Sequence, residues 1–236
     1  MKRILIFGDS ILRGVYVEEE TRTHRLYRER IANLSASSGC EVKNCSVMGA
    51  TVETGEELIR RKFQPYAEGQ PYAEGQPDAD GDPATVIFEY GGNDCDYKWQ
   101  DISDNPTGEF SPNTPADRFV SGYGKCIEYA KSLGSRVFLC NLVPLDAGRY
   151  IEWISRNLSK ENILSWLGDT SMLYRWQEYY NRTAEQIAAK YGCPLIDIRS
   201  PFLLSHSYSG LLSPDGIHPT VEGHRVIDRL IAEAVV

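Results

Sequence analysis

Two segments near opposite ends of the chain contain the residue types of nucleophilic catalysis. Gly8-Asp9-Ser10 directly follows an apolar run, and Asp215-Gly216-Ile217-His218 lies close to the C-terminal end. A serine nucleophile needs an imidazole to accept its proton and a carboxylate to orient that imidazole. Of the four histidines, only His218 follows an aspartate by three residues. We therefore predict Ser10 as nucleophile, His218 as base and Asp215 as orienting acid, although each segment alone is also ordinary turn composition.

Two further segments offer hydrogen-bond donors to a developing oxyanion. Asn93, in Gly91-Gly92-Asn93-Asp94, follows the apolar run 85–90, and Gly49 follows the run 41–47. An amide donor of this kind is typically worth about 3 to 4 kcal/mol of transition-state stabilisation. A glycine lets a backbone N–H approach a substrate oxygen because it has no Cβ. Each segment alone is also compatible with a plain turn or loop, so the prediction depends on the complete set.

The elements that must position these residues alternate along the chain. Short β-rich runs alternate with helical patterns, which is typical of a parallel sheet covered by helices. The predicted strands are 3–7, 41–47, 85–90, 136–141 and 194–198. One helix is predicted with Thr114 as N-cap and Pro115 as its first residue. Others are predicted over 171–191 and from Thr220, each with apolar residues at spacings of three and four. Because parallel strands end at one edge of a sheet, the four segments are expected to meet there.

In order along the chain, Gly8-Asp9-Ser10, Gly49, Gly91-Gly92-Asn93-Asp94 and Asp215-Gly216-Ile217-His218 resemble the four sequence blocks of the SGNH/GDSL hydrolase family. The resemblance implies an α/β fold, a flavodoxin-like three-layer α/β/α sandwich with a five-stranded parallel sheet, as a single domain over 1–236. It also implies an oxyanion hole formed by the Ser10 N–H, the Gly49 N–H and Asn93. Ile11 stands where the GDSL tetrapeptide has Leu. Asp9 and Asp94 are interpreted as residues that fix loops.

Two segments depart from the alternating plan. Three tandem hexamers with Pro and Gly in each predict a solvated loop at about 64–83. Asp78, Asp80 and Asp82 in that loop lack the rest of a calcium-binding pattern. The apolar segment 145–169 is long for a connection, so it is predicted either to form a lid or pocket wall or to add a small helix to the core.

Composition excludes several classes of partner. A net charge of −8 without a cationic stripe argues against nucleic-acid binding. No stretch reaches the roughly 18 apolar residues of a spanning helix, and the first apolar run is too short for a secretory leader. The six scattered cysteines are therefore expected to be reduced thiols, and the expected location is the cytoplasm. No metal or cofactor motif is found, so neither is predicted.

The predicted activity is hydrolysis of a small-molecule oxygen ester through an acyl-enzyme on Ser10. The resemblance leaves the substrate open, and a short acyl group, such as acetyl on a carbohydrate, is favoured. Lysophospholipase or thioesterase activity, acyl transfer, and a non-catalytic binding protein on the same scaffold are the alternatives. Aromatic residues that could stack on sugars, line an acyl pocket or fill the core are Tyr150, Trp153, Trp166, Tyr174 and Trp176. The oligomeric state is not predicted.

Overall fold

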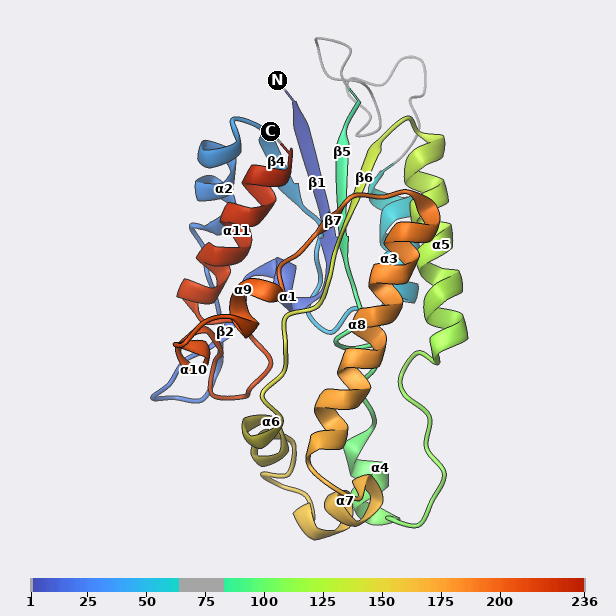
Figure 1. Ribbon diagram of the computed structural model, residues 1–236, viewed down its shortest axis with the longest axis vertical. Helices are drawn as coiled ribbons and strands as arrows, with labels where there is room; N and C mark the ends of the chain where they lie inside the picture. Colours follow the sequence, from blue (N-terminus) through green and yellow to red (C-terminus); the bar gives the residue numbers. More distant parts are fainter. Residues whose placement is uncertain (1, 64–82, 236) are drawn as a thin grey trace.

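The computed structural model describes residues 2–63 and 83–235. Within these ranges a sheet of five parallel strands runs through the molecule in the order β4-β1-β5-β6-β7 (Figure 1). The strands are β1 (Arg3–Gly8), β4 (Glu41–Asn44), β5 (Thr85–Glu89), β6 (Arg136–Cys140) and β7 (Leu195–Ile196). The predicted five-stranded parallel sheet is therefore confirmed.

Successive residues of the inner strands face opposite sides of this sheet. Leu5 and Phe7 pack with α3 (Val52–Lys62), α5 (Ala116–Ser132) and α8 (Ser171–Tyr191) on one side. Ile4 and Ile6 pack with α2 (Arg30–Ser38) and α11 (Val221–Val235) on the other. Figure 1 shows these two helical layers on either side of the strands. Because both faces of the sheet are covered, the strands are apolar along almost their whole length. The three-layer sandwich is confirmed.

Short elements surround the carboxyl ends of the strands. Helix α1 (Ser10–Arg13) follows β1 directly, and an antiparallel hairpin of β2 (Val15–Val17) and β3 (His24–Leu26) comes next. Helices α4 (Trp99–Asp104), α6 (Ala147–Ile154) and α7 (Lys160–Leu167) gather at the lower end of the molecule in Figure 1. They enclose a third apolar cluster that includes Trp99, Tyr150 and Ile163. Two further short helices, α9 (Ser200–Leu203) and α10 (Tyr208–Leu211), precede α11.

Several boundaries differ from the sequence-based predictions. Strands β4 and β7 are shorter than predicted, and α5 begins at Ala116, after Pro115 rather than at it. The segment 145–169 forms α6 and α7. The hairpin of β2 and β3 was not predicted. The predicted repeat loop lies outside the described residues except for Pro83, and the assignment of 1–236 to one domain stays a prediction.

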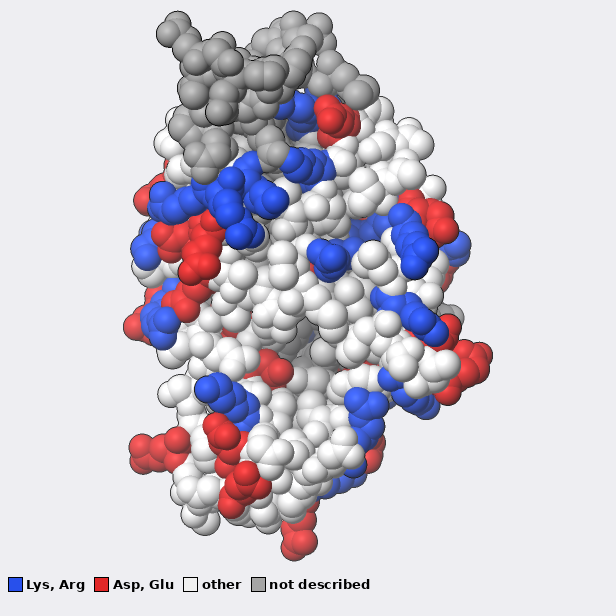
Figure 2. All heavy atoms as spheres, turned by 180° about the vertical axis from the view of Figure 1, so that it is seen from behind, with Lys and Arg blue, Asp and Glu red and all other residues white. Residues whose placement is uncertain are grey.

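The described residues contain no disulfide bond and no membrane-spanning helix, and the visible surface carries mixed charge. All six cysteines are unpaired, and five of them are buried. Over residues 2–63 and 83–235, no helix combines the length and apolar character needed to cross a bilayer. On the face shown in Figure 2, Lys and Arg are interspersed with Asp and Glu, and a hollow near the middle is bordered mostly by uncharged residues.

Candidate active site

Ser10, His218 and Asp215 form one continuous chain of hydrogen bonds. The Oγ atom of Ser10 lies 2.8 Å from Nε2 of His218, and Nδ1 of His218 lies 2.5 Å from Oδ2 of Asp215. An ionised carboxylate can only accept, so Nδ1 carries the proton and Nε2 is left to accept the proton of the serine hydroxyl. All three residues are buried, with exposed fractions of 6%, 4% and 0% in the order Ser10, His218, Asp215. This is the arrangement in which a serine can be deprotonated as it attacks.

The turn between Asp215 and His218 brings the carboxylate to the imidazole. Oδ1 of Asp215 accepts the backbone N–H groups of Ile217 and His218 at 3.2 and 3.1 Å. Burial alone would raise the pKa of Asp215, but the hydrogen bonds and the nearby imidazole of His218 outweigh burial and lower it. Gly216 adopts a φ of +77°, and a Cβ there would lie 2.6 Å from the carbonyl oxygen of Asp146. Glycine is therefore required at this position of the turn.

Ser10 begins α1 at the carboxyl end of β1. A Cβ at Gly8 would lie 2.9 Å from the carbonyl oxygen of Glu89 in the neighbouring strand β5, so a glycine is needed for the close approach. Oδ1 of Asp9 accepts the N–H of Ile11 at 2.8 Å and caps α1. Asp9 therefore fixes the turn that presents Ser10, in agreement with the interpretation of Asp9 as a loop-fixing residue.

Asn93 and Gly49 lie beside Ser10, and all three residues line the same cavity. Gly49, with a φ of +76°, follows Met48 in a turn closed by the N–H of Ala50 bonding to the carbonyl of Val47 at 3.1 Å. A positive φ at this third position is what a type II turn requires. The side-chain amide nitrogen of Asn93 donates to Oδ2 of Asp9 at 3.0 Å and to the carbonyl of Ala50 at 3.2 Å. Both amide hydrogens thus have protein acceptors, so donation to an oxyanion requires Asn93 to share or release one.

A buried pair of acids lies beneath the nucleophile. Asp9 and Glu89 are each 1% exposed. Burial raises the pKa of Glu89 well above its ordinary value, and the nearby charge and hydrogen bond of Asp9 raise it further. Asp9 is stabilised by the N–H of Ile11 and the amide of Asn93, so we assign the proton to Glu89. The neutral carboxyl group of Glu89 then donates a hydrogen bond to the carboxylate of Asp9. Glu89 was not among the predicted site residues, although a lone charge in the apolar run 85–90 was a signal.

Asp94 joins the Asn93 loop to the first turn of α3. Its two carboxylate oxygens lie 3.0 and 3.2 Å from the N–H of Val52. Burial raises the pKa of Asp94 to about 7, although the hydrogen bond from Val52 opposes the shift. The backbone carbonyl of Asp94 accepts the N–H of Thr114 at 3.0 Å. Asp94 therefore fixes a loop, as the sequence analysis expected.

The hairpin of β2 and β3 places His24 against His218. The two imidazole centroids are 5.2 Å apart with an angle of 79° between the rings. The ring centroids of His24 and Trp153 lie 5.9 Å apart in an edge-to-face arrangement. Partial burial lowers the pKa of His24, and the neighbouring His218 adds to the effect. His24 was not among the predicted site residues, because no sequence pattern links it to His218.

The cavity beside Ser10 has a volume of about 340 Å³. Its polar part is the wall that contains Asp9, Ser10, Asn93 and His218. Asp96 and Gln177 also line it, but both are already hydrogen-bonded, Asp96 to Trp99 and Tyr150 and Gln177 to Val143 and Arg199. Most of the remaining wall is aromatic or aliphatic and comes from the loop before α4, from the 145–169 segment and from α8: Tyr97, Trp99, Leu142, Val143, Leu145, Tyr150, Trp166, Leu167, Met172, Leu173 and Trp176. Of the five aromatic residues named from the sequence, Tyr150, Trp166 and Trp176 line the cavity, whereas Trp153 and Tyr174 do not line it. The site therefore combines a small polar wall with a larger apolar chamber.

Solved structures with the same arrangement of elements match this chain over almost its whole length. A lipase/acylhydrolase from Enterococcus faecalis shares 18% identity at a TM-score of 0.66, with 100% of this chain and 95% of that chain covered. A GDSL-like lipase from Bacteroides thetaiotaomicron shares 17% identity at a TM-score of 0.61, with coverage of 99% and 87%. An acetyl xylan esterase shares 18% identity at a TM-score of 0.59, with coverage of 99% and 100%. No match to a curated protein is found. At these identities the likeness shows the fold.

A parallel α/β/α sandwich that joins a serine, an imidazole and a carboxylate at the carboxyl ends of its strands has the architecture of a serine hydrolase. The sequence model of the GDSL-like Lipase/Acylhydrolase family matches residues 6–226, and the chain belongs to that family. The protein is accordingly an ester-hydrolysing serine hydrolase. The resemblance drawn from the four sequence blocks is confirmed.

Proposed function

We propose that the chain hydrolyses oxygen esters through an acyl-enzyme on Ser10, with His218 as general base and Asp215 as the residue that orients His218. The observation that carries the proposal is the unbroken hydrogen-bond chain from the Ser10 hydroxyl to the Asp215 carboxylate. The small-molecule ester binds in the cavity beside Ser10, whose polar wall contains the nucleophile.

The reaction has two steps that use the same groups. Oγ of Ser10 attacks the carbonyl carbon while Nε2 of His218 takes the hydroxyl proton, and the imidazolium returns this proton to the departing alcohol oxygen. Water then attacks the acyl-enzyme with His218 again as base, and the carbonyl–Oγ bond breaks as the imidazolium returns its proton to Oγ, which releases the acid and restores the Ser10 hydroxyl. Asp215, whose pKa is lowered, stays ionised and stabilises the imidazolium in both steps.

The backbone N–H groups of Ser10 and Gly49 and the side chain of Asn93 are proposed to hold the oxyanion. The three residues line the cavity together, which supports this role. Asn93 can contribute once it turns one amide hydrogen from the carbonyl of Ala50 toward the oxyanion. The bond to Asp9 would keep the amide oriented during that change.

The apolar chamber supports an acyl group longer than acetyl. A carbohydrate would leave most of its hydroxyl groups against Leu142, Leu145 and Leu173, because the polar groups of Asp96 and Gln177 in the same wall already bond to the protein. An alkyl chain gains about 0.8 kcal/mol for each methylene group that leaves water. We therefore infer a medium-chain acyl ester, closer to the lipase-like alternative than to the short acyl group favoured by the sequence. Hydrolysis of acetylated carbohydrates stays the alternative.

Replacement of the nucleophile tests the proposal. Ser10→Ala should lower kcat for p-nitrophenyl esters by at least about 10⁴-fold, because the three residues of such a triad act as a unit. Ser165→Ala, at an exposed position of α7, is the matched control and should retain wild-type turnover. Undiminished hydrolysis by Ser10→Ala would refute the assignment.

A further inference from the structure

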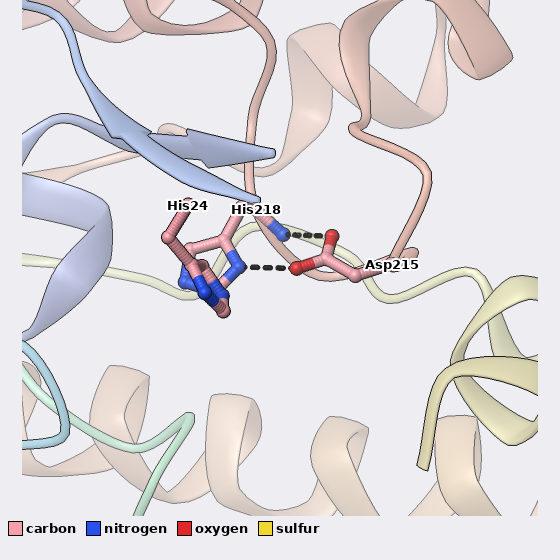
Figure 3. A group of neighbouring side chains, drawn as sticks. All are labelled: His24, Asp215 and His218. Atoms are coloured by element: carbon pink, nitrogen blue, oxygen red, sulfur yellow. Dashed lines mark hydrogen bonds and ion pairs between the residues drawn. The ribbon is translucent and has the colours of Figure 1, made fainter. Parts of the chain in front are cut away.

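His24 brings a third metal-ligating side chain to Asp215 and His218. One nitrogen or oxygen ligand atom from each lies within 4.8 Å of the other two. Figure 3 shows the imidazole of His24 next to that of His218, whose Nδ1 and backbone N–H both point to Asp215. His24 comes from β3, whereas the other two residues come from the loop before α11. The juxtaposition is therefore made by the fold and not by local sequence.

The hairpin that presents His24 is tied to the loop that presents His218. In the hairpin, His24 pairs with Val17, and the N–H of Val17 donates to Oγ of Ser213 at 3.1 Å. The N–H of Ser213 in turn donates to the carbonyl of His218 at 2.7 Å. Nε2 of the buried His224 donates to the carbonyl of Val15 at 2.8 Å. These hydrogen bonds fix the backbone of His24 relative to that of His218.

Two imidazoles and one carboxylate are a donor set that Zn²⁺ prefers, whereas Mg²⁺ and Ca²⁺ prefer oxygen ligands. Ligand atoms on a tetrahedral zinc ion lie about 3.3 Å apart, given zinc–nitrogen distances of about 2.0 to 2.1 Å. The side chain of His24 is exposed and can rotate to close the remaining gap. Zinc sites with three protein ligands complete their coordination with water or another small ligand.

We propose that His24, His218 and Asp215 form an inhibitory site for Zn²⁺ or a similar transition-metal ion. This inference rests on the proposed function for its inhibitory effect. The ring of His218 has two nitrogens, of which one holds the proton shared with Asp215 and the other faces the Ser10 hydroxyl. Because Asp215 faces Nδ1, an ion that His218 shares with Asp215 binds Nδ1. The proton of the neutral ring then lies on Nε2, which can no longer accept the proton of Ser10. Bound zinc therefore switches the esterase off, and its removal restores activity.

Zinc binding and inhibition can be measured separately. Zinc chloride is titrated by calorimetry into wild type, His24→Gln and His206→Gln, the last being an exposed histidine between α9 and α10. Loss of an outer-shell partner alone typically costs a metal site about 10- to 100-fold in affinity, so His24→Gln should weaken zinc binding by at least about tenfold. His206→Gln should bind zinc as wild type does. Equal affinity in His24→Gln and wild type would overturn the site.

The ratio of p-nitrophenyl ester hydrolysis with zinc to that without zinc gives the second readout. This ratio should fall in wild type and in His206→Gln, recover after EDTA, and stay unchanged with magnesium chloride. In His24→Gln the zinc concentration for half-inhibition should rise in step with the calorimetric affinity. Inhibition that is identical in all three proteins would mean that zinc acts elsewhere and would contradict the proposal. Calorimetry needs no turnover, so a protein that binds zinc through His24 but hydrolyses no ester would refute only the proposed function.

Discussion

The Oγ atom of Ser10 and the Nε2 atom of His218 lie 2.8 Å apart, although 208 positions separate the two residues in the sequence. Ser10 follows the first strand of the sheet, and His218 precedes the last helix. Their contact depends on the parallel sheet. Ser10 follows the carboxyl end of β1, and the loop that contains Asp215 and His218 lies at the same edge of the sheet. The chemistry of the site is therefore a direct product of the topology.

Asn93 should contribute more to kcat than to KM if it holds the oxyanion. Asn93→Ala should lower kcat by about 10²- to 10³-fold, the usual cost of one oxyanion donor. Its amide also bonds to Asp9, so the melting temperature serves as a control for a structural effect. A change confined to KM, or a loss of activity that simply follows the melting temperature, would count against the oxyanion role.

The length of the acyl chain should determine turnover through the apolar chamber. For p-nitrophenyl esters, kcat/KM should rise by up to about fourfold per methylene group and peak in the range of about six to ten carbons. Met172→Trp narrows the chamber and should shift the peak toward shorter chains, whereas Met172→Leu conserves volume and should not. A peak at acetate in the wild-type enzyme would instead favour the carbohydrate-ester alternative.

Gly216 should be intolerant of a side chain. A left-handed backbone at a non-glycine residue costs about 1 to 3 kcal/mol, and the added Cβ would also collide with backbone atoms of Asp146 and Tyr150. Gly216→Ala should therefore lower both Tm and kcat, because the turn sets the distance from Asp215 to His218. Gly210→Ala is the control, since a Cβ there meets nothing within 4 Å. Equal Tm and kcat in the two variants would contradict the role of this turn.

The stability of the protein should depend on pH through Asp94. The pKa of Asp94 is about 7 in the folded state against an ordinary value of 3.8. The stabilisation that comes from protonated Asp94 is therefore complete below pH 3.8 and is lost as the pH rises toward 7. Asp94→Asn removes this titration. The free energy of unfolding of wild type should therefore fall relative to that of Asp94→Asn between about pH 4 and 7, by at most about 1.4 kcal/mol per pH unit. Denaturant titrations measure both free energies of unfolding. If the difference between wild type and Asp94→Asn does not change with pH, Asp94 is ionised over this whole range.

The sheet and the Ser10, His218 and Asp215 contacts could be foreseen because they depend on order along the chain. Apolar runs identify buried parallel strands, and residues that follow such strands must share an edge. The hairpin that carries His24 escaped prediction because its strands are three residues long, and its position is set by bonds from Ser213 and His224, far away in sequence. The sequence offered a pocket wall only as one alternative for 145–169 and its aromatic residues, since it does not show that Trp99 and Trp166 face inward. Their ring contact, at 6.4 Å, arises only when α4 and α7 pack together.

Covalent labelling shows whether Ser10 is the nucleophile. The protein is treated with a fluorophosphonate, and the modified residue is located by mass spectrometry of its peptides. We expect a single adduct on Ser10, formed rapidly by wild type and lost in His218→Ala, because the hydroxyl reacts only when the imidazole accepts its proton. An adduct on another serine, or no adduct in a folded protein that still hydrolyses esters, would contradict it.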